Sequence, residues 1–312
     1  MIFISFGKTV SNIRKNKHIP ISLVTNSTIT KSSYTRFVEG KTQPSINSFI
    51  TILDNLHVNF EEFLYIERGF KPNYFNQMIN KIQGEALKCN IPALTQMHET
   101  FAVYNYQEPH NETYLHFKCV TKLIINYIEE EPFDKESKKV LLDYLTKCEI
   151  WTHYEHMLFN CVIFIFDIDR VKAMENCIIK NLDNYQLLHT YGNEGFRTLI
   201  IILAFYILNE DLLAAIKVIG KLEEFKLQDY MIFEKNLYKL FSGIVFVLSK
   251  EETGFKNIEE ALQVFKLTDA NEYIFASIGF LKRICKIYDY HHPQLDKIYK
   301  MYADFDTPKP NY

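Results

Sequence analysis

Glycine, proline and tryptophan are scarce in this chain, which holds 10 Gly, 9 Pro and one Trp in 312 residues. Strand patterns that alternate between tight glycine turns are absent, so an all-β fold is not expected. Six scattered cysteines include no CxxC pair. A disulfide framework or a zinc site would need patterned spacing, and we therefore expect free thiols in a reducing compartment.

Long hydrophobic runs are also missing. The longest apolar run, Leu199 to Leu208, is half of what a membrane-spanning helix needs. The opening residues, MIFISFGKTVSNIRK, lack the charge-first order of a signal peptide. We expect a soluble, cytoplasmic protein without a membrane partner.

Motifs that carry catalysis do not occur either. The sequence contains no GxGxxG, P-loop or GxSxG motif, and its carboxylates are spread along helix faces. His153 and His156 are three residues apart around Glu155. Zinc hydrolase helices place two histidines four residues apart, so a surface or satisfied histidine is the better interpretation. We expect no enzyme, no catalytic residue, no metal and no cofactor.

Charge is distributed unevenly. The whole chain has a net charge of only -3, but residues 1–50 hold seven Lys and Arg and one acid, Glu39. A basic start on an acidic remainder predicts a local module that binds a polyanion.

Helical spacing of apolar residues, at i, i+3, i+4 and i+7, dominates the sequence and predicts an all-α fold. Within the first 66 residues it predicts five short helices: 2–15, 21–25, 31–39, 45–56 and 60–66. Thr30, Ser45 and Asn59 are candidate N-caps, and Gly40 stands where the third helix should end. Helices this short can bury their apolar faces only against each other, as in a compact five-helix domain of the lambda-repressor type.

The second and third predicted helices fit a helix-turn-helix, with 26–29 as the turn and 31–39 as the recognition helix. Arginine can bind guanine with two hydrogen bonds, and serine and lysine can contact bases or phosphates. The polar residues placed on or near this motif are candidates for binding double-stranded DNA: Arg14, Lys15, Ser22, Lys31, Ser32, Ser33, Arg36, Lys41 and Thr42.

The pattern breaks at ERGFKPN, so we expect a helix-turn-helix domain at 1–66, a linker at 67–73, a helical domain at 74–303 and a tail at 304–312. Consecutive helices with short joints form hairpins that stack into a solenoid. The predicted helices of this domain are 74–88, 91–105, 111–130, 135–147, 151–167, 171–182, 194–208, 212–226, 230–249, 258–267, 272–288 and 294–301. Gly243 in mid-helix and a turn at Gly254 are similar to one tetratricopeptide unit.

Three segments near the N-terminus read FGKTVSNIR, TKSSYTRFVEG and ILDNLHVNFEEF. They resemble the N-terminal domain of the Rgg/GadR/MutR regulators, whose cues are a start like LGKTLRRLR, a recognition helix like SKSQISRFERG and a close like LLDKLNITIDEF. WTHYEHMLFN, at 151–160, is similar to a further segment of that family. The resemblance covers most of the chain and is dense only at its start.

This resemblance implies a homodimeric transcription regulator of the quorum-sensing type, whose helical domain binds a short, imported, hydrophobic peptide pheromone. Contact with RNA polymerase is a further expectation. Side chains that pair with peptide amides or a peptide carboxylate suit such a site. The candidates are Asn160, Arg197, Tyr230 and Asn236.

Two alternatives remain open. One is a regulator of the same fold whose helical domain binds a protein partner or no ligand. The other is a helical-repeat scaffold that does not bind DNA. Replacing Lys31 and Arg36 with alanine separates a regulator, which would lose DNA affinity, from a scaffold, which would have none to lose.

Overall fold

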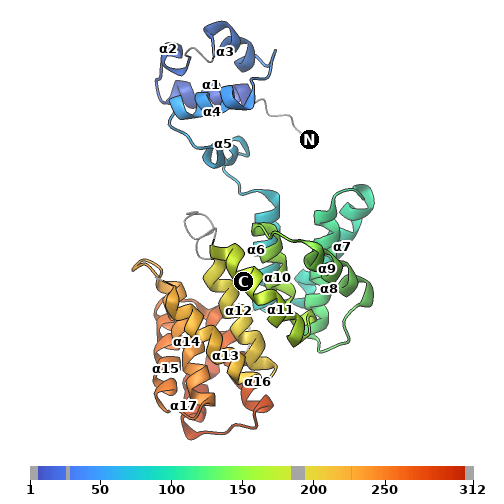
Figure 1. The fold of residues 1–312 in the computed structure, drawn as a ribbon, viewed down its shortest axis with the longest axis vertical. Coiled ribbons are helices and arrows are strands. Elements are labelled where there is room, and N and C mark those ends of the chain that lie inside the picture. The colour runs from blue at the N-terminus through green and yellow to red at the C-terminus, as the bar shows by residue number, and fades with distance from the viewer. Residues whose placement is uncertain (1–5, 26–28, 184–193, 226, 306–312) are drawn as a thin grey trace. The chain divides into compact units, whose positions relative to one another are not determined.

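A computed structural model describes residues 6–25, 29–183, 194–225 and 227–305, without the side chains of 176, 177 and 179–183. Over these residues the regular secondary structure is helical and contains no strand, which confirms the predicted all-α class (Figure 1). The chain divides into two compact units, an N-terminal unit of residues 1–78 and a helical-repeat unit of residues 79–312. Among the described helices, none is long and apolar enough to cross a bilayer.

The N-terminal unit is a bundle of short helices around one apolar core. Within its described residues, the helices before α6 are α1 Phe6–Asn16, α2 Ile21–Val24, α3 Lys31–Val38, α4 Ile46–Asn55 and α5 Phe60–Glu67. Rings from four of them meet in the core, where Phe49 stacks on Phe6 and contacts Phe37 and Phe63 edge to face. Each helix thus buries its apolar face only by packing on the others.

Local capping fixes where these helices begin. The side chains of Thr30, Ser45 and Asn59 accept hydrogen bonds from the backbone N–H groups of Ser33, Ser48 and Glu62, at 3.2, 3.2 and 2.7 Å. These bonds satisfy donors that the first turn of a helix leaves free. All three predicted caps are confirmed, and Gly40 follows α3 with a φ of 74°.

The N-terminal unit also depends on a close approach of two backbones. A Cβ atom on Gly7 of α1 would lie 2.2 Å from the carbonyl oxygen of Phe37 and 2.8 Å from the Cα of Val38. Only a residue without a side chain lets α1 approach the C-terminal end of α3 this closely.

Helical hairpins build the helical-repeat unit. Its helices are α6 Tyr74–Leu87 (which begins in the N-terminal unit), α7 Ile91–Gln107, α8 Glu112–Ile128, α9 Lys135–Lys147, α10 His153–Val162, α11 Ile168–Asp183, α12 Glu194–Leu208, α13 Leu212–Glu224, α14 Ile232–Leu248, α15 Thr253–Leu267, α16 Asn271–Ile287 and α17 Pro293–Met301. α7 packs along α8, α12 along α13 and α14 along α15. This arrangement agrees with the predicted tetratricopeptide-like solenoid.

Three predicted boundaries are wrong. The helix expected at 151–167 ends at Val162, and a 3-10 turn, Ile163–Ile165, leads to an extended Phe166. The next helix then starts at Ile168 rather than 171, because the Asp167 carboxylate accepts a hydrogen bond from the backbone N–H of Arg170 at 2.8 Å. Likewise α15 starts at Thr253, so Gly254 lies in its first turn and not in the preceding turn.

Two glycines allow α14 and α15 to pack closely. A Cβ on Gly243 would lie 2.8 Å from the carbonyl oxygen of Gly254, and a Cβ on Gly254 would lie 2.3 Å from that of Gly243. The small residues expected from the repeat pattern therefore do occupy the hairpin contact.

A contact between distant parts of the sequence joins α8 to α16. Arg283 donates a hydrogen bond from Nη1 to the Tyr127 hydroxyl at 2.7 Å, and its guanidinium lies 4.9 Å from the centre of that ring. Tyr127 also stacks on Phe164, with 4.3 Å between the ring centroids.

The cysteines with described side chains are free thiols: Cys89, Cys119, Cys148, Cys161 and Cys285. The Cys177 side chain lies outside the described residues. So do the turn at 26–28, residues 2–5 of the first predicted helix, and 306–312 of the tail. Asp304 belongs to a short 3-10 helix, Ala303–Phe305.

Candidate nucleic-acid interface and ligand-binding residues

α3 has a buried face and an exposed polar face. Tyr34 and Phe37 are 1% and 2% exposed and fix the helix on the core. Lys31, Ser32, Ser33 and Arg36 are all exposed on the opposite side. The polar side chains therefore project from a rigidly held helix, as base readout in a groove requires.

α2 stands before α3 as a short supporting helix. Its Val24 is fully buried, and Asn55 of α4 donates a hydrogen bond to the Val24 carbonyl at 3.1 Å. Ser22 is exposed, and a hydroxyl at such a position can donate to a phosphate.

Arg14 and Lys15 follow each other in α1 but have different surroundings. Arg14 is half-buried and donates from Nη1 to the Ile19 carbonyl at 2.8 Å. Burial raises the pKa of Tyr34, and the neighbouring Arg14 guanidinium opposes this shift. Arg14 thus ties α1 to the segment that enters α2, whereas Lys15 is exposed.

The two candidates beyond α3 lie on the turn to α4. Lys41 is exposed and pairs with Glu39 at 2.7 Å, and Thr42 is half-buried. An exposed pair of this kind contributes little stability, so Lys41 can exchange Glu39 for a phosphate. Lys17 is not among the predicted candidates, and its ammonium group donates to the carbonyls of Leu56 and His57 at the end of α4, at 2.9 and 3.1 Å.

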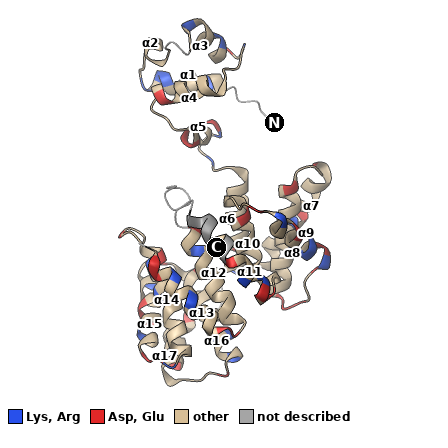
Figure 2. Ribbon diagram, viewed as in Figure 1, with Lys and Arg blue, Asp and Glu red and all other residues tan. Residues whose placement is uncertain are grey.

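Basic and acidic side chains occupy different helices of the N-terminal unit (Figure 2). Arg14 and Lys15 lie in the last turn of α1 and Arg36 in the last turn of α3, while the first turn of α5 carries Glu61 and Glu62. The positive charge is thereby gathered on the helices that bear the DNA-binding candidates.

In the helical-repeat unit, Asn160 has one satisfied and one unsatisfied polar atom. Its Nδ2 donates to the Thr198 hydroxyl at 3.0 Å, which links α10 to α12. Its Oδ1 is buried and accepts no hydrogen bond from the described residues. A buried acceptor without a partner is costly, and a donor from a ligand would relieve that cost.

Arg197 also connects helices, through a carboxylate. Its Nε and Nη2 both donate to one oxygen of Glu234, at 2.9 and 2.7 Å, and its guanidinium lies 5.3 Å from the centre of the Phe233 ring. The Glu234 side chain is 3% exposed, whereas that of Arg197 is 50% exposed. Arg197 therefore already neutralises a buried charge and still presents an edge to solvent.

The other two candidates do not join this group. Asn236 is buried and donates to the Ala261 carbonyl at 3.1 Å, so it holds α14 against α15. Tyr230 precedes α14 and is 75% exposed. The structure thus places Asn160 and Arg197 on connected helices, and it gives Asn236 a packing partner.

Glu155 and His156 stabilise the start of α10 and its packing. Burial alone would raise the pKa of Glu155, but hydrogen bonds from Tyr144 and from the backbone and hydroxyl of Thr152 outweigh it and lower the pKa. This capping box starts α10. Burial lowers the pKa of His156 to about 4, and the neutral ring packs on Trp151. Across the described residues, no His, Cys, Asp and Glu gather as metal ligands would.

Several solved structures share this architecture. A protein from Listeria monocytogenes EGD-e, described as a candidate transcriptional regulator, is 19% identical, with 92% of this chain and 99% of that chain covered at a TM-score of 0.77. The SHP pheromone receptor Rgg2 from Streptococcus dysgalactiae is 20% identical, with 90% and 99% covered and a TM-score of 0.68. PrgX, in its complex with iCF10, is 14% identical, with 99% of both chains covered and a TM-score of 0.66.

A family match assigns the chain. The family model of the "HTH-type transcriptional regulator Rgg, C-terminal domain" matches residues 101–275. That span is more than half of the chain and covers α8 to α15 completely. The structural likenesses establish the same helical fold, and the description of the family names a transcriptional regulator rather than an enzyme. This chain belongs to the Rgg family of helix-turn-helix transcriptional regulators.

Proposed function

We propose that this regulator binds specific DNA through its N-terminal helix-turn-helix and is controlled by a short peptide bound in its helical-repeat unit. The observation that carries the DNA part is α3, whose Tyr34 and Phe37 are buried while Lys31, Ser32, Ser33 and Arg36 are exposed. In this proposal residues 1–66 bind DNA, 67–73 link, and 74–303 bind the peptide and form a homodimer.

The exposed side chains divide by role. Arg36 and the two serines of α3 suit base edges, whereas Lys15, Ser22, Lys31, Lys41 and Thr42 suit phosphates. Arg14 positions the helix-turn-helix instead of contacting DNA, because its guanidinium is bonded to the Ile19 carbonyl just before α2. Two units of a dimer would read half-sites separated by about one duplex turn, ~34–36 Å.

Substituting the α3 cations tests DNA binding. With the protein's own upstream DNA, Arg36→Ala is expected to cost roughly 1–3 kcal/mol and to relax preference at one base pair. Lys31→Ala should instead weaken binding to all DNA sequences alike. It should also reduce the salt dependence of the binding constant by about one phosphate contact. Fluorescence anisotropy over a salt series measures both effects.

Lys71→Ala is the matched control, because it removes one exposed positive charge from the segment after α5. It should leave affinity close to that of the unaltered protein. If all three variants bound specific and random DNA like the parent, α3 would not be the recognition helix.

Two observations support control by a peptide. Among proteins of this fold, one is described as a pheromone receptor and another was solved in a complex with iCF10. In this chain, the unsatisfied Oδ1 of Asn160 can accept a peptide N–H, and the exposed edge of Arg197 can bind a peptide carboxylate. To act as a switch, the peptide must bind two states of the regulator with different affinities.

A pair of asparagine variants tests the peptide site. With short hydrophobic peptides selected from a synthetic library, Asn160→Ala is expected to weaken binding roughly 5- to 100-fold, because a buried peptide N–H would lose its acceptor. Asn236→Ala should lower the unfolding midpoint instead, since Asn236 bonds to Ala261. Calorimetry and thermal unfolding separate the two outcomes. Equal peptide affinity in the parent and Asn160→Ala would remove Asn160 from the site.

A further inference from the structure

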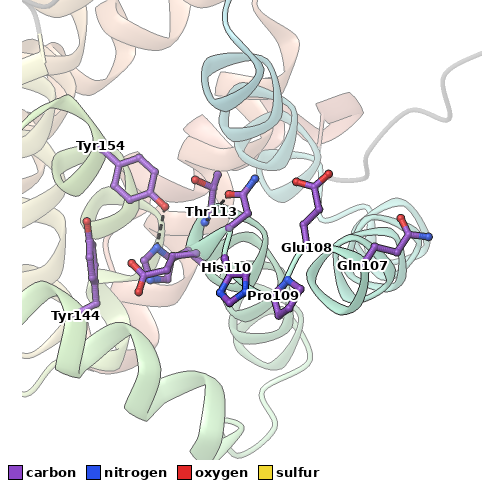
Figure 3. A pocket seen from close by; sticks show the side chains of 10 residues that line it. Gln107, Glu108, Pro109, His110, Thr113, Tyr144 and Tyr154 are labelled. Carbon is purple, nitrogen blue, oxygen red and sulfur yellow. Dashed lines mark hydrogen bonds between the residues drawn. The ribbon is translucent and has the colours of Figure 1, made fainter. Parts of the chain in front are cut away.

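A pocket of about 810 Å³ lies beside the turn between α7 and α8, against α9 and α10 (Figure 3). None of its lining residues is a candidate for DNA or peptide binding. Its walls include Glu108, His110, Glu112, His116, Tyr144 and Tyr154. Figure 3 shows the two tyrosine rings on one side of the pocket and Glu108 on the turn at the other side.

The aromatic wall is held in place by its own contacts. His116 is 3% exposed, and its Nδ1 lies 2.8 Å from the Tyr154 hydroxyl. Its ring is 4.3 Å from that of Tyr144, whose hydroxyl donates to Glu155 at 2.6 Å. A ligand would therefore meet rings whose positions are fixed before it binds, which reduces the entropic cost of binding.

The charge of the pocket has one sign. Its lining contains the carboxylates of Glu108 and Glu112 and no Lys or Arg. Burial lowers the pKa of His116, so its imidazole is neutral near pH 7, although Glu112 and Glu155 oppose the shift. Glu112 and Glu155 also add to the raised pKa of Tyr154, which burial dominates. An anion entering this pocket would meet repulsion without a compensating cation.

We propose that this pocket binds a small organic ammonium ion. The faces of Tyr144 and Tyr154 attract a cation with apolar substituents, as aromatic cages do. Glu108 and Glu112 supply the counter-charge at the rim. His116 lines the pocket beside these rings, and its neutral imidazole adds no positive charge that would oppose the cation.

Choline and 1,4-diaminobutane are suitable probes for the full-length protein. The neutral isostere of choline, 3,3-dimethylbutan-1-ol, has the same shape without the charge. Glu112→Gln removes one rim carboxylate and is expected to weaken binding of both cations ~5-fold, the effect of a partly exposed ion pair. Glu99→Gln is the matched control, because it removes an exposed carboxylate from α7 outside the pocket.

Saturable binding of the cations by calorimetry, weakened in Glu112→Gln and unchanged in Glu99→Gln, would support the site. Three results would overturn it: no cation binding at millimolar concentrations, equal binding of the neutral isostere, or equal effects of the two glutamate variants. Circular dichroism of each variant confirms that the fold is retained. None of these residues belongs to the proposed DNA or peptide sites. Neither outcome therefore bears on the proposed DNA binding and peptide control, which the Arg36, Lys31 and Asn160 variants test separately.

Discussion

Gly7→Ala is expected to unfold the N-terminal unit and abolish DNA binding, while the helical-repeat unit stays folded. The added Cβ would lie 2.2 Å from the Phe37 carbonyl oxygen and 2.8 Å from the Val38 Cα, and neither backbone atom can rotate away. Overpacking of this kind costs ~3 kcal/mol or more, a large share of the ~5 kcal/mol that stabilises a small domain.

Hydrogen exchange of the full-length protein measures this effect directly. Amides of α1 and α3 should lose their protection in Gly7→Ala, and those of α14 and α15 should keep it. Gly84→Ala is the control, because nothing lies within 4 Å of a Cβ placed at that helical glycine. Full protection of α1 in Gly7→Ala would show that the two helices can separate at little cost.

The second large effect is expected in the α14–α15 hairpin. In Gly254→Ala the new Cβ would lie 2.3 Å from the Gly243 carbonyl oxygen and 2.8 Å from the Val247 nitrogen. Both atoms belong to the backbone of α14, so the two helices must separate. Separation leaves voids around Ile258 and Ala261, which are fully buried. We expect a loss of ~3 kcal/mol in the stability of the helical-repeat unit.

Urea unfolding followed by circular dichroism measures the loss as a lower midpoint. The matched control is Gly220→Ala in α13, where nothing lies within 4 Å of the new Cβ. Alanine is the better helix former there and should raise stability by ~0.5–1 kcal/mol. If Gly254→Ala and Gly220→Ala shifted the midpoint in the same direction, the stability of the unit would not depend on the close packing of α14 and α15 at Gly254.

Local chemistry made much of this fold predictable. The caps at Thr30, Ser45 and Asn59 depend on a side chain and a backbone N–H three residues later, so a short stretch of sequence contains all the information. The spacing of apolar residues likewise placed most of the helices, because a helix that packs on a core must repeat its apolar face.

Segments in which two local preferences compete were not predictable in this way. CVIFIFDID has helical neighbours, yet its apolar residues allow an extended Phe166, and the Asp167 carboxylate then starts a new helix. The three-residue spacing of Thr152 and Glu155 is that of a capping box, so the start of α10 is readable from the sequence.

Site residues are harder still, because their partners come from distant parts of the chain. Asn160 on α10 and Asn236 on α14 are the same residue type, but one keeps a buried oxygen without a partner among the described residues and the other bonds to Ala261. Arg14 is one of the predicted DNA-binding residues, and only the fold shows that its guanidinium meets the Ile19 carbonyl. No pattern within one helix encodes these differences.

The bond between Arg283 and Tyr127 changes how the helical-repeat unit can come apart. In a solenoid each hairpin contacts only its neighbours, so the terminal hairpin can detach alone. Here α16 is also bonded to α8, 156 residues earlier in the sequence. Detaching α16 therefore also breaks its contact with α8. Unravelling from the C-terminal side is thereby coupled to the stability of α8, and the unit unfolds more like a closed ring than an open row of repeats.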